Sequence, residues 1–520
     1  MMACNDIFRW QRPFPLKKRL FSALWSLLAV LIMLQFIACK DYETPDSYNV
    51  LPAEGDQVGS QTLDRVLKSE AYTPEEFLEH LGSPSFESIM DFIAPQIVPI
   101  AKNIAMTKMQ SHLPTLDRMF ENEAGTNPDG SRRWQFESYT FSYHSRAVDG
   151  RDLVMSGRVT FPNNTATGIP HHVKTLSLHS HQAFLWFDWA PSESMMFMPL
   201  RSLWNSAVIE PDFQQWGINY GREAESFGSP LIQTQQMADC VVAALEVMRR
   251  HGVALASDGY STFWGTSQSA SVPFHFTKWY ETEAPEWFRQ AVRLRSVFSG
   301  EGPLDIAAFY EHFCSHQELL KSSFDTFFIL PGAFSKKQLG GFEGKDFVHD
   351  MYNENHVTVN GTDYTLYEAL SRNMLLDSIA NRTIPCGIEF PSTLDGILPS
   401  DMLTPDCRLD RNSPKVQALF KTFHVHSDLS GWHPQTEIYF ALYPEDRMIP
   451  YDQTRELFMQ LAASSPNHCL HWLDVPQNNG MFDVLVGDDT SHFVTSFMML
   501  LFMSNAEEPK DMAKIYAGKQ

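Results

Sequence analysis

The chain has few basic residues for its size. Only 40 lysines and arginines stand against 62 aspartates and glutamates among its 520 residues, which gives a net charge of −22. A surface of this sign repels phosphate backbones, so the composition argues against a nucleic-acid-binding protein. The seven cysteines are too few and too irregularly spaced to define a disulfide framework. The sequence also lacks internal repeats and heptad runs, which excludes solenoid and coiled-coil architectures.

Apolar and aromatic residues, by contrast, are plentiful. Hydrophobic residues make up 43% of the chain and aromatic residues 13%, which is enough for a large core and too much for a disordered chain. Two of the cysteines, Cys386 and Cys407, lie in one proline-rich stretch. They either form a disulfide or remain buried thiols, and the sequence leaves both alternatives open.

The N-terminal segment is typical of a secretory signal. Basic residues 17–19 precede an apolar run, residues 20–38, that stops at Cys39. Phe36-Ile37-Ala38-Cys39 resembles the processing box of bacterial lipoproteins, and a polar, turn-rich tether follows it. We therefore expect residues 1–38 to be a lipoprotein signal peptide. Cys39 would then carry a lipid anchor in the envelope of a Gram-negative bacterium, at its outer membrane. An uncleaved anchor is the alternative, because the run is about long enough to span a bilayer.

Short apolar segments alternate with amphipathic ones from residue 134 onward. A hairpin with its turn at Asp149-Gly150 opens this region. Apolar residues at three- and four-residue spacing predict a helix over residues 234–250, begun by Thr234 and ended by Gly252. Strands are expected at residues 136–144, 153–161, 174–179, 206–209, 260–264, 292–298, 437–443 and 468–475. This alternation predicts an α/β protein with a mostly parallel, twisted sheet and helices on both faces.

Two segments interrupt that alternation. Residues 39–133 are expected to be a tether and a helical segment, because Thr73-Pro74-Glu75-Glu76 suits a helix start. Residues 304–431 separate the first part of the core, 134–303, from its second part, 432–520. An insertion of that size should have structure of its own. We expect it to form a mostly helical lid over the residues considered next.

The strongest local signal is Gly265-Thr266-Ser267-Gln268-Ser269. It follows an expected strand and precedes an expected helix. A serine on such a sharp turn needs small residues two positions to either side, because the strained backbone brings them close. The pattern predicts Ser267 as a nucleophile, and the alternative is a plain serine turn at the end of a strand. Pro273 removes one helical hydrogen bond and is expected to kink the helix that follows.

An acid and a histidine follow Ser267 at the ends of later strands. Asp446 lies in the turn after residues 437–443, and His492 lies in the loop after residues 468–475. Loops at the carboxyl ends of parallel strands are where such sheets place function. We therefore expect Asp446 as the acid and His492 as the base. The rival acids are Glu445 and three aspartates near His492, namely Asp483, Asp488 and Asp489.

With these residues in this order, the chain resembles the lipase and esterase branch of the α/β-hydrolases. The resemblance covers roughly residues 134–505 and includes the family's first hairpin, its glycine turn, and the passages into and out of a lid. The matching segments are Tyr143–Pro162, Ala207–Gly217, Gly300–Asp305 and Gly431–Pro434. The resemblance implies an α/β-hydrolase fold, a triad of Ser267, His492 and Asp446, and no cofactor.

The resemblance also implies two hydrogen-bond donors for an oxyanion. The backbone N–H of Gln268 is the first. The second comes from the loop after residues 174–179, hence from Ser180 or His181. Related families often have His-Gly where this chain has His179-Ser180, so the identity of the second donor stays open.

Other conspicuous residues have plainer interpretations. Two histidine pairs suggest metal binding, but neither has further ligands at the spacing of a metal site, so both are expected to be structural. These pairs are His179 with His181, and His424 with His426. The aromatic segment Phe184–Trp189 either lines an acyl pocket or packs in the core.

The function expected from the sequence is hydrolysis of carboxylic esters through an acyl-enzyme intermediate. The substrate would be a small molecule or an acyl ester. A peptidase of the same fold would use the same triad, and a surface lipoprotein that only binds ligands would keep the fold without the chemistry. The net negative charge and the signal segment fit all three alternatives.

Lipidation of Cys39 is directly testable. Mass spectrometry of the protein extracted from membranes should find a mature N-terminus at Cys39 that carries acyl chains, because one lipid group with several chains gives a firm anchor. Cys39→Ser should release the protein from the membrane fraction. Recovery of an intact peptide spanning residues 30–45 would contradict the prediction.

Overall fold

A computed structural model provides the structure of the chain. It describes residues 63–80, 98–166, 168–180, 198–214, 216–219, 222–223, 226, 228–315, 342–359, 361–372, 403–407, 410–446, 448–474, 495, 499, 502–503 and 505–516. Cys39, and with it the predicted signal and lipid anchor, lies outside these residues. Within them, no helix is long and apolar enough to cross a membrane.

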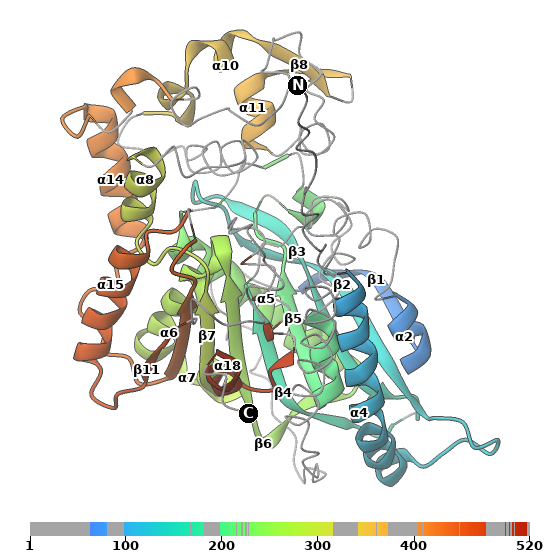
Figure 1. Cartoon of the computed structure of the whole chain (residues 1–520). Helices are drawn as coiled ribbons and strands as arrows, with labels where there is room; N and C mark the ends of the chain where they lie inside the picture. Colours follow the sequence, from blue (N-terminus) through green and yellow to red (C-terminus); the bar gives the residue numbers. More distant parts are fainter. Residues whose placement is uncertain are drawn as a thin grey trace, which may run out of the picture.

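A nine-stranded sheet forms the centre of the described structure, in the order β1-β2-β3-β5-β4-β6-β7-β10-β11 (Figure 1). The first pairings, from β1 to β5, are antiparallel, and the pairings from β5 to β11 are parallel. The mostly parallel sheet predicted from the sequence is therefore confirmed. The strands are β1 (Leu63–Tyr72), β2 (Trp134–Arg146), β3 (Asp152–Asn164), β4 (His171–His179), β5 (Ser206–Pro211), β6 (Val253–Thr266), β7 (Leu294–Gly300), β10 (Glu437–Leu442) and β11 (Leu470–Asp474).

Consecutive residues of β6 show that both faces of the sheet are covered. Phe263 meets Phe276 of α6, with the ring centroids 4.8 Å apart. Trp264 meets Arg201, whose guanidinium lies 3.9 Å from the indole centroid. Neighbouring residues of a strand point to opposite faces, so α6 and the segment of Arg201 lie on opposite sides of the sheet. The main helices are α2 (Pro74–His80), α4 (Val98–Ala124), α5 (Pro230–Arg250), α6 (Ser271–Thr282), α7 (Glu286–Val292), α15 (Tyr451–Ser464) and α18 (Pro509–Tyr516).

The N-terminal segment differs from the expectation of a tether followed by helices. Residues 63–72 form β1, which pairs with β2 from Leu63 opposite Tyr143 to Tyr72 opposite Phe136. Most of its side chains are exposed and several are charged, so the alternation of apolar residues that marks a strand is missing. Charged side chains suit an edge strand, because they oppose pairing with another sheet.

The predicted helix start after this strand is confirmed. The backbone N–H of Glu76 donates to Thr73 Oγ1 at 3.2 Å, and the N–H of Thr73 donates to Glu76 Oε2 at 2.9 Å. This reciprocal capping box begins α2. The expected start of the later helix at Thr234 is wrong, because α5 already begins at Pro230, which is well suited to a first helical position. Its end is as predicted, with Gly252 at φ +71°.

The described parts of residues 304–431 include helices and one hairpin. They lie beyond the end of the sheet from which α8 departs, which is the carboxyl end of β7 (Figure 1). The hairpin was not expected, although Asn360-Gly361 between alternating β-branched residues is a strong hairpin signal, and Gly361 has φ +80°. The elements are α8 (Ile306–Ser315), α10 (Asp350–Glu354), β8 (His356–Val359), β9 (Thr362–Thr365), α11 (Leu366–Ser371) and α14 (Pro414–His426).

A buried arginine ties the end of the chain to the middle of the sheet. Arg201 lies in the short helix η2 (Met198–Trp204), and its Nε donates to Ser177 Oγ of β4 at 2.6 Å. Its two Nη atoms donate to three backbone carbonyls of the C-terminal segment, those of Met503, Ala506 and Glu507. The planar fork of an arginine can serve several acceptors at once, which a lysine cannot. Arg201 therefore closes the Trp264 face of the core.

Replacing Arg201 should destabilise the protein strongly. Arg201→Met keeps most of the volume but leaves buried carbonyls without donors, so we expect the free energy of unfolding to fall by about 3 kcal/mol or more. Urea denaturation followed by circular dichroism measures the loss. Arg289→Met is the control, because Arg289 makes an exposed ion pair with Glu286 on α7 and should matter by less than about 1 kcal/mol. Equal losses for both variants would contradict the role of Arg201.

Candidate active site

Ser267 lies on a strained turn between β6 and α6. The strand ends at Thr266 in extended conformation, and Ser267 then has φ +55°. A non-glycine residue in this left-handed region costs about 1 kcal/mol or more. Strain of this kind persists only where the surrounding structure imposes it, and it is concentrated at functional sites. The elbow geometry predicted for Ser267 is therefore present in the backbone.

Two glycines make room for this turn. A Cβ atom on Gly265 would lie 2.6 Å from Pro273 Cγ and 2.9 Å from Ser180 Oγ. A Cβ atom on Gly302 would lie 2.0 Å from the carbonyl oxygen of Ser267. The space on both sides of the serine is thus already filled, which is the physical reason for the small residues around it.

Ser269 and Pro273, which follow the nucleophile candidate in the chain, also have structural explanations. Pro273 lies in the first turn of α6, where a missing N–H removes no helical hydrogen bond. The expected loss of a hydrogen bond at this proline is therefore wrong, and its ring instead packs against Gly265. Ser269 is buried, and its hydroxyl donates to the carbonyl of Thr266 at 3.1 Å. A serine at this position fits without disturbing the turn.

Three neighbouring strands end beside one another at this edge. Thr266 of β6 is in register with Gly300 of β7, and Gly300 is in register with Ala441 of β10. The chain segments that leave these strands therefore start in one row. They contain Ser267, Glu301 and Asp446 respectively. The sheet thus brings the ends of distant sequence segments together.

Asp446 is a buried carboxylate with several donors. It is 6% exposed, whereas its neighbour Glu445 is exposed. The backbone N–H groups of Met448 and Ile449 donate to its Oδ1 at 2.8 and 3.1 Å, and the hydroxyl of Thr495 donates to its Oδ2 at 3.4 Å. Hydrogen bonds from donors favour the ionised form of a carboxyl group. The turn after β10 therefore places a buried, hydrogen-bonded carboxyl group at the edge of the sheet.

Glu301 is a second buried carboxyl at this place, and the sequence analysis did not single it out. It follows β7, its side chain is fully buried, and its backbone has φ +47°. The backbone N–H of Tyr443 donates to its Oε1 at 2.8 Å. Burial first, and then the neighbouring charge of Asp446, raise the pKa of Glu301 well above its usual value. An acid directly after an apolar strand was the available signal, the same one that identified Asp446.

The expected oxyanion donors are only partly described. Gln268 lies in the short helix η4 (Ser267–Ser269), directly after the serine as expected. Ser180 is buried after β4, but its backbone N–H donates to the carbonyl of Trp264 at 3.0 Å. That amide is therefore engaged in the sheet. His181 and His492 lie outside the described residues, as do the rival acids Asp483, Asp488 and Asp489 and the aromatic segment 184–189.

The histidines suggested as possible metal ligands are only partly described, because His181 lies outside the described residues. Within the described part of the chain, no group of three or more His, Cys, Asp or Glu side chains is arranged to hold a metal ion. The ring of His179 is buried and stacks on Trp264, and its Nε2 is hydrogen-bonded to Ser177 Oγ at 2.8 Å. His424 is exposed. Cys407 is a buried thiol, and its possible partner Cys386 lies outside the described residues.

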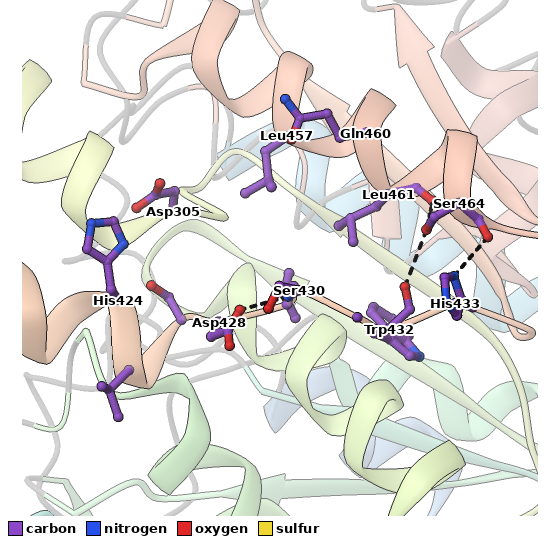
Figure 2. A pocket seen from close by; sticks show the side chains of 14 residues that line it. Asp305, His424, Asp428, Ser430, Trp432, His433, Leu457, Gln460, Leu461 and Ser464 are labelled. Carbon is purple, nitrogen blue, oxygen red and sulfur yellow. Dashed lines mark hydrogen bonds between the residues drawn. The ribbon is translucent and has the colours of Figure 1, made fainter.

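A cavity of about 540 Å³ lies between the end of α14 and α15 (Figure 2). Most of the polar groups around it serve local structure. The carboxylate of Asp305 accepts from two N–H groups that begin α8, and His433 and Ser464 bond to backbone carbonyls. Neither Ser267 nor Asp446 lines this cavity, so it is not part of the candidate active site.

Comparison with known proteins identifies the fold. No protein-family model matches the sequence, and no curated protein matches it. The crystal structure of the rice cell wall degrading esterase LipA from Xanthomonas oryzae is similar, with a TM-score of 0.53 and 14% identity over 87% of this chain and 98% of that one. A second crystal structure of that esterase has a TM-score of 0.51, at 14% identity over 84% and 98%.

A weaker likeness, with a TM-score of 0.39 and 11% identity, links 89% of this chain to 88% of Candida antarctica lipase A in its closed state. The esterase structures are only 14% identical to this chain, so their similarity shows the fold alone. Together with the sheet described above, the similarity to the esterase shows that the chain has the α/β-hydrolase fold.

The contact between Gly302 and the serine turn gives a test of the site's geometry. Gly302→Ala would place a methyl carbon 2.0 Å from the Ser267 carbonyl oxygen, so the turn must shift. We expect the free energy of unfolding, measured with urea, to fall by about 2 kcal/mol or more. Gly130→Ala is the control, because Gly130 has φ +80° but no atom within 4 Å of a Cβ, so it costs only about 1 kcal/mol of backbone strain. An equal cost at both glycines would contradict the packing.

Proposed function

We propose that the protein is a serine hydrolase that cleaves carboxylic esters through an acyl-enzyme intermediate. Ser267 is the nucleophile, His492 the general base and Asp446 the acid that orients the histidine. The substrate is an acyl ester that reaches the carboxyl edge of the sheet, beneath the insertion of residues 304–431. In this proposal the lipid on Cys39 holds the enzyme at the membrane of the bacterial envelope, where such substrates occur.

The observation that carries the proposal is the backbone of Ser267. Its φ of +55° directly after β6, in a space bounded by Gly265 and Gly302, is a costly conformation for a residue with a side chain. It gives an α/β-hydrolase an accessible nucleophile at the top of the sheet. A plain turn at the end of a strand would relax to an ordinary conformation or carry glycine.

The acid is better assigned to Asp446 than to Glu445. A triad acid has to stay ionised and fixed while the histidine gains a proton. Asp446 is buried and accepts two backbone hydrogen bonds, which provide both properties. Glu445 is exposed to solvent, where its position and charge would be poorly controlled.

In the proposed reaction, His492 accepts the hydroxyl proton as Ser267 Oγ attacks the ester carbonyl carbon, and then donates that proton to the leaving alcohol. Water hydrolyses the acyl-enzyme by the same steps in reverse order. The backbone N–H of Gln268 is one donor to the oxyanion. The N–H of Ser180 is engaged by Trp264, so the second donor is better assigned to His181.

Replacing each residue of the triad tests the proposal. Ser267→Ala and His492→Ala should lower kcat for p-nitrophenyl acyl esters by about a thousandfold or more. Asp446→Asn should lower it by a comparable factor, because it favours the wrong imidazole tautomer. A fluorophosphonate probe should label the wild type and leave Ser267→Ala unlabelled, since it reports an activated serine whatever the substrate.

The controls separate the alternatives. Ser271→Ala, a nearby serine at the start of α6, should be labelled like the wild type. Faster turnover of aminoacyl anilides than of esters would favour the peptidase alternative. Failure of the probe to label the folded wild type would favour a protein that only binds ligands. Full activity of Ser267→Ala would sink the mechanism altogether.

A further inference from the structure

Two buried carboxyl groups meet at the carboxyl edge of the sheet, and the triad uses only one. Glu301 is 0% exposed and Asp446 is 6% exposed. They follow neighbouring strands, β7 and β10, whose register brings Gly300 beside Ala441. A buried negative charge is costly, and two in contact cannot both persist, so one of the two groups has to be neutral.

The donors around the pair decide which group is ionised. Asp446 accepts from two backbone N–H groups, and the two acids share the hydroxyl of Thr495. Glu301 accepts one backbone N–H, from Tyr443, at its Oε1. Its Oε2 is buried and has no hydrogen-bond partner of ordinary geometry among the described residues. The negative charge is therefore better stabilised on Asp446, and a proton on Glu301 supplies the donor that the pair otherwise lacks.

The backbone shows that Glu301 is held in this position. Its N–H donates to the carbonyl of Ala441 at 2.9 Å, which ties the residue to the end of β10. Its φ of +47° is unfavourable for a side chain of this kind, so the surrounding structure imposes it. Gly302, the next residue, contacts the Ser267 backbone. The segment that carries Glu301 thus contacts both the acid's strand and the nucleophile's turn.

We propose that Glu301 is a positioning residue that stays protonated and donates a hydrogen bond from its carboxyl O–H to the carboxylate of Asp446, fixing that carboxylate for His492. This inference rests on the proposed function, because it assigns Asp446 the triad role. The proton stays on Glu301 through the cycle, while His492 gains and loses the proton of Ser267. Asp446 keeps its charge, and the shared hydrogen bond fixes its rotamer.

The polar groups that face Glu301 come from three other segments. They are Asp446 and the backbone N–H of Tyr443 after β10, the hydroxyl of Thr495, and the phenol of Tyr516 in α18. Burial first, and then the charge that Glu301 would carry, raise the pKa of Tyr516. Among the described residues, Glu301 forms no ion pair that would favour its ionised form, so its pKa stays raised.

This arrangement has a defined sign in its pH dependence. The pKa of Glu301 is raised in the folded state, so the folded protein binds more protons than the unfolded chain above the usual glutamate pKa. The free energy of unfolding therefore falls as pH rises through the window between the two values. Ionisation also places a second charge beside Asp446 and removes the hydrogen bond to it. Activity should fall as pH rises through the raised pKa of Glu301 in the folded protein.

Variants at Glu301 test the inference. Glu301→Gln keeps a neutral donor, so it should retain kcat within about threefold of the wild type and lose the decline in kcat/KM and in stability that ionisation of Glu301 causes at higher pH. Glu301→Ala removes the donor and should lower kcat on the order of tenfold or more, as when a catalytic side chain loses its orienting partner. A purely structural role would not give rescue by glutamine together with loss of that pH-dependent decline.

A control variant and a measurement without substrate complete the test. Asp239→Asn on α5 removes another buried acid, whose pKa burial raises to about 8, but one that contacts Ser145 of β2 instead. It should alter the pH dependence of stability and leave the pH profile of activity unchanged. Infrared spectra of the wild type at neutral pH should contain a protonated carboxyl band that Glu301→Gln lacks, even if the protein proves to have no hydrolase activity.

The outcomes are separable. If Glu301→Gln is as inactive as Asp446→Asn, Glu301 is itself the ionised acid and the inference is overturned. It is also overturned if the infrared band is absent, or if folded Glu301→Ala keeps wild-type kcat and pH profile. If Glu301→Ala does not fold, the glutamine variant and the infrared band still decide. A wild type that no fluorophosphonate labels would refute the proposed function. The infrared band that Glu301→Gln lacks would still show whether Glu301 is protonated.

Discussion

The hydrogen-bond register of three parallel strands, β6, β7 and β10, is the constraint on which the candidate site depends. Because Thr266, Gly300 and Ala441 share one row of the ladder, the turns that follow them have to fit into the same small space. Gly302 has no side chain because the serine turn already fills its surroundings. A slip by one residue would turn every side chain of the strand to the other face and separate the carboxyl groups.

Most of the sheet could be predicted because its strands are buried and apolar. The exceptions show where periodicity carries no information. In β1 most side chains are exposed, so the sequence of this edge strand resembles that of a polar linker. Its identity as a strand comes from its pairing with β2. The hairpin of β8 and β9 was not predicted, because its two strands are only four residues long and too short to show a clear alternation; the Asn360-Gly361 turn was the only local signal.

The candidate site was predictable only as far as it is local. The requirement for small residues around Ser267 acts over five positions, so the chain states it directly. Asp446 could be placed because function in such sheets follows strand ends. Glu301 satisfies the same rule, but its importance comes from contact with Asp446, and that contact depends on pairing between segments more than a hundred residues apart. Long-range pairing of this kind leaves no local signature.

The hold of Arg201 on the last turns of the chain bears on when the protein can finish folding. A ribosome delivers the strands of the sheet first, but the carbonyls that receive the guanidinium come from residues 503–507 of 520. Until they emerge, a buried charge beside Trp264 would have too few partners, so that face of the core stays open. For a chain whose N-terminus predicts export across a membrane, delayed closure keeps the polypeptide unfolded enough to be translocated until these residues have been made.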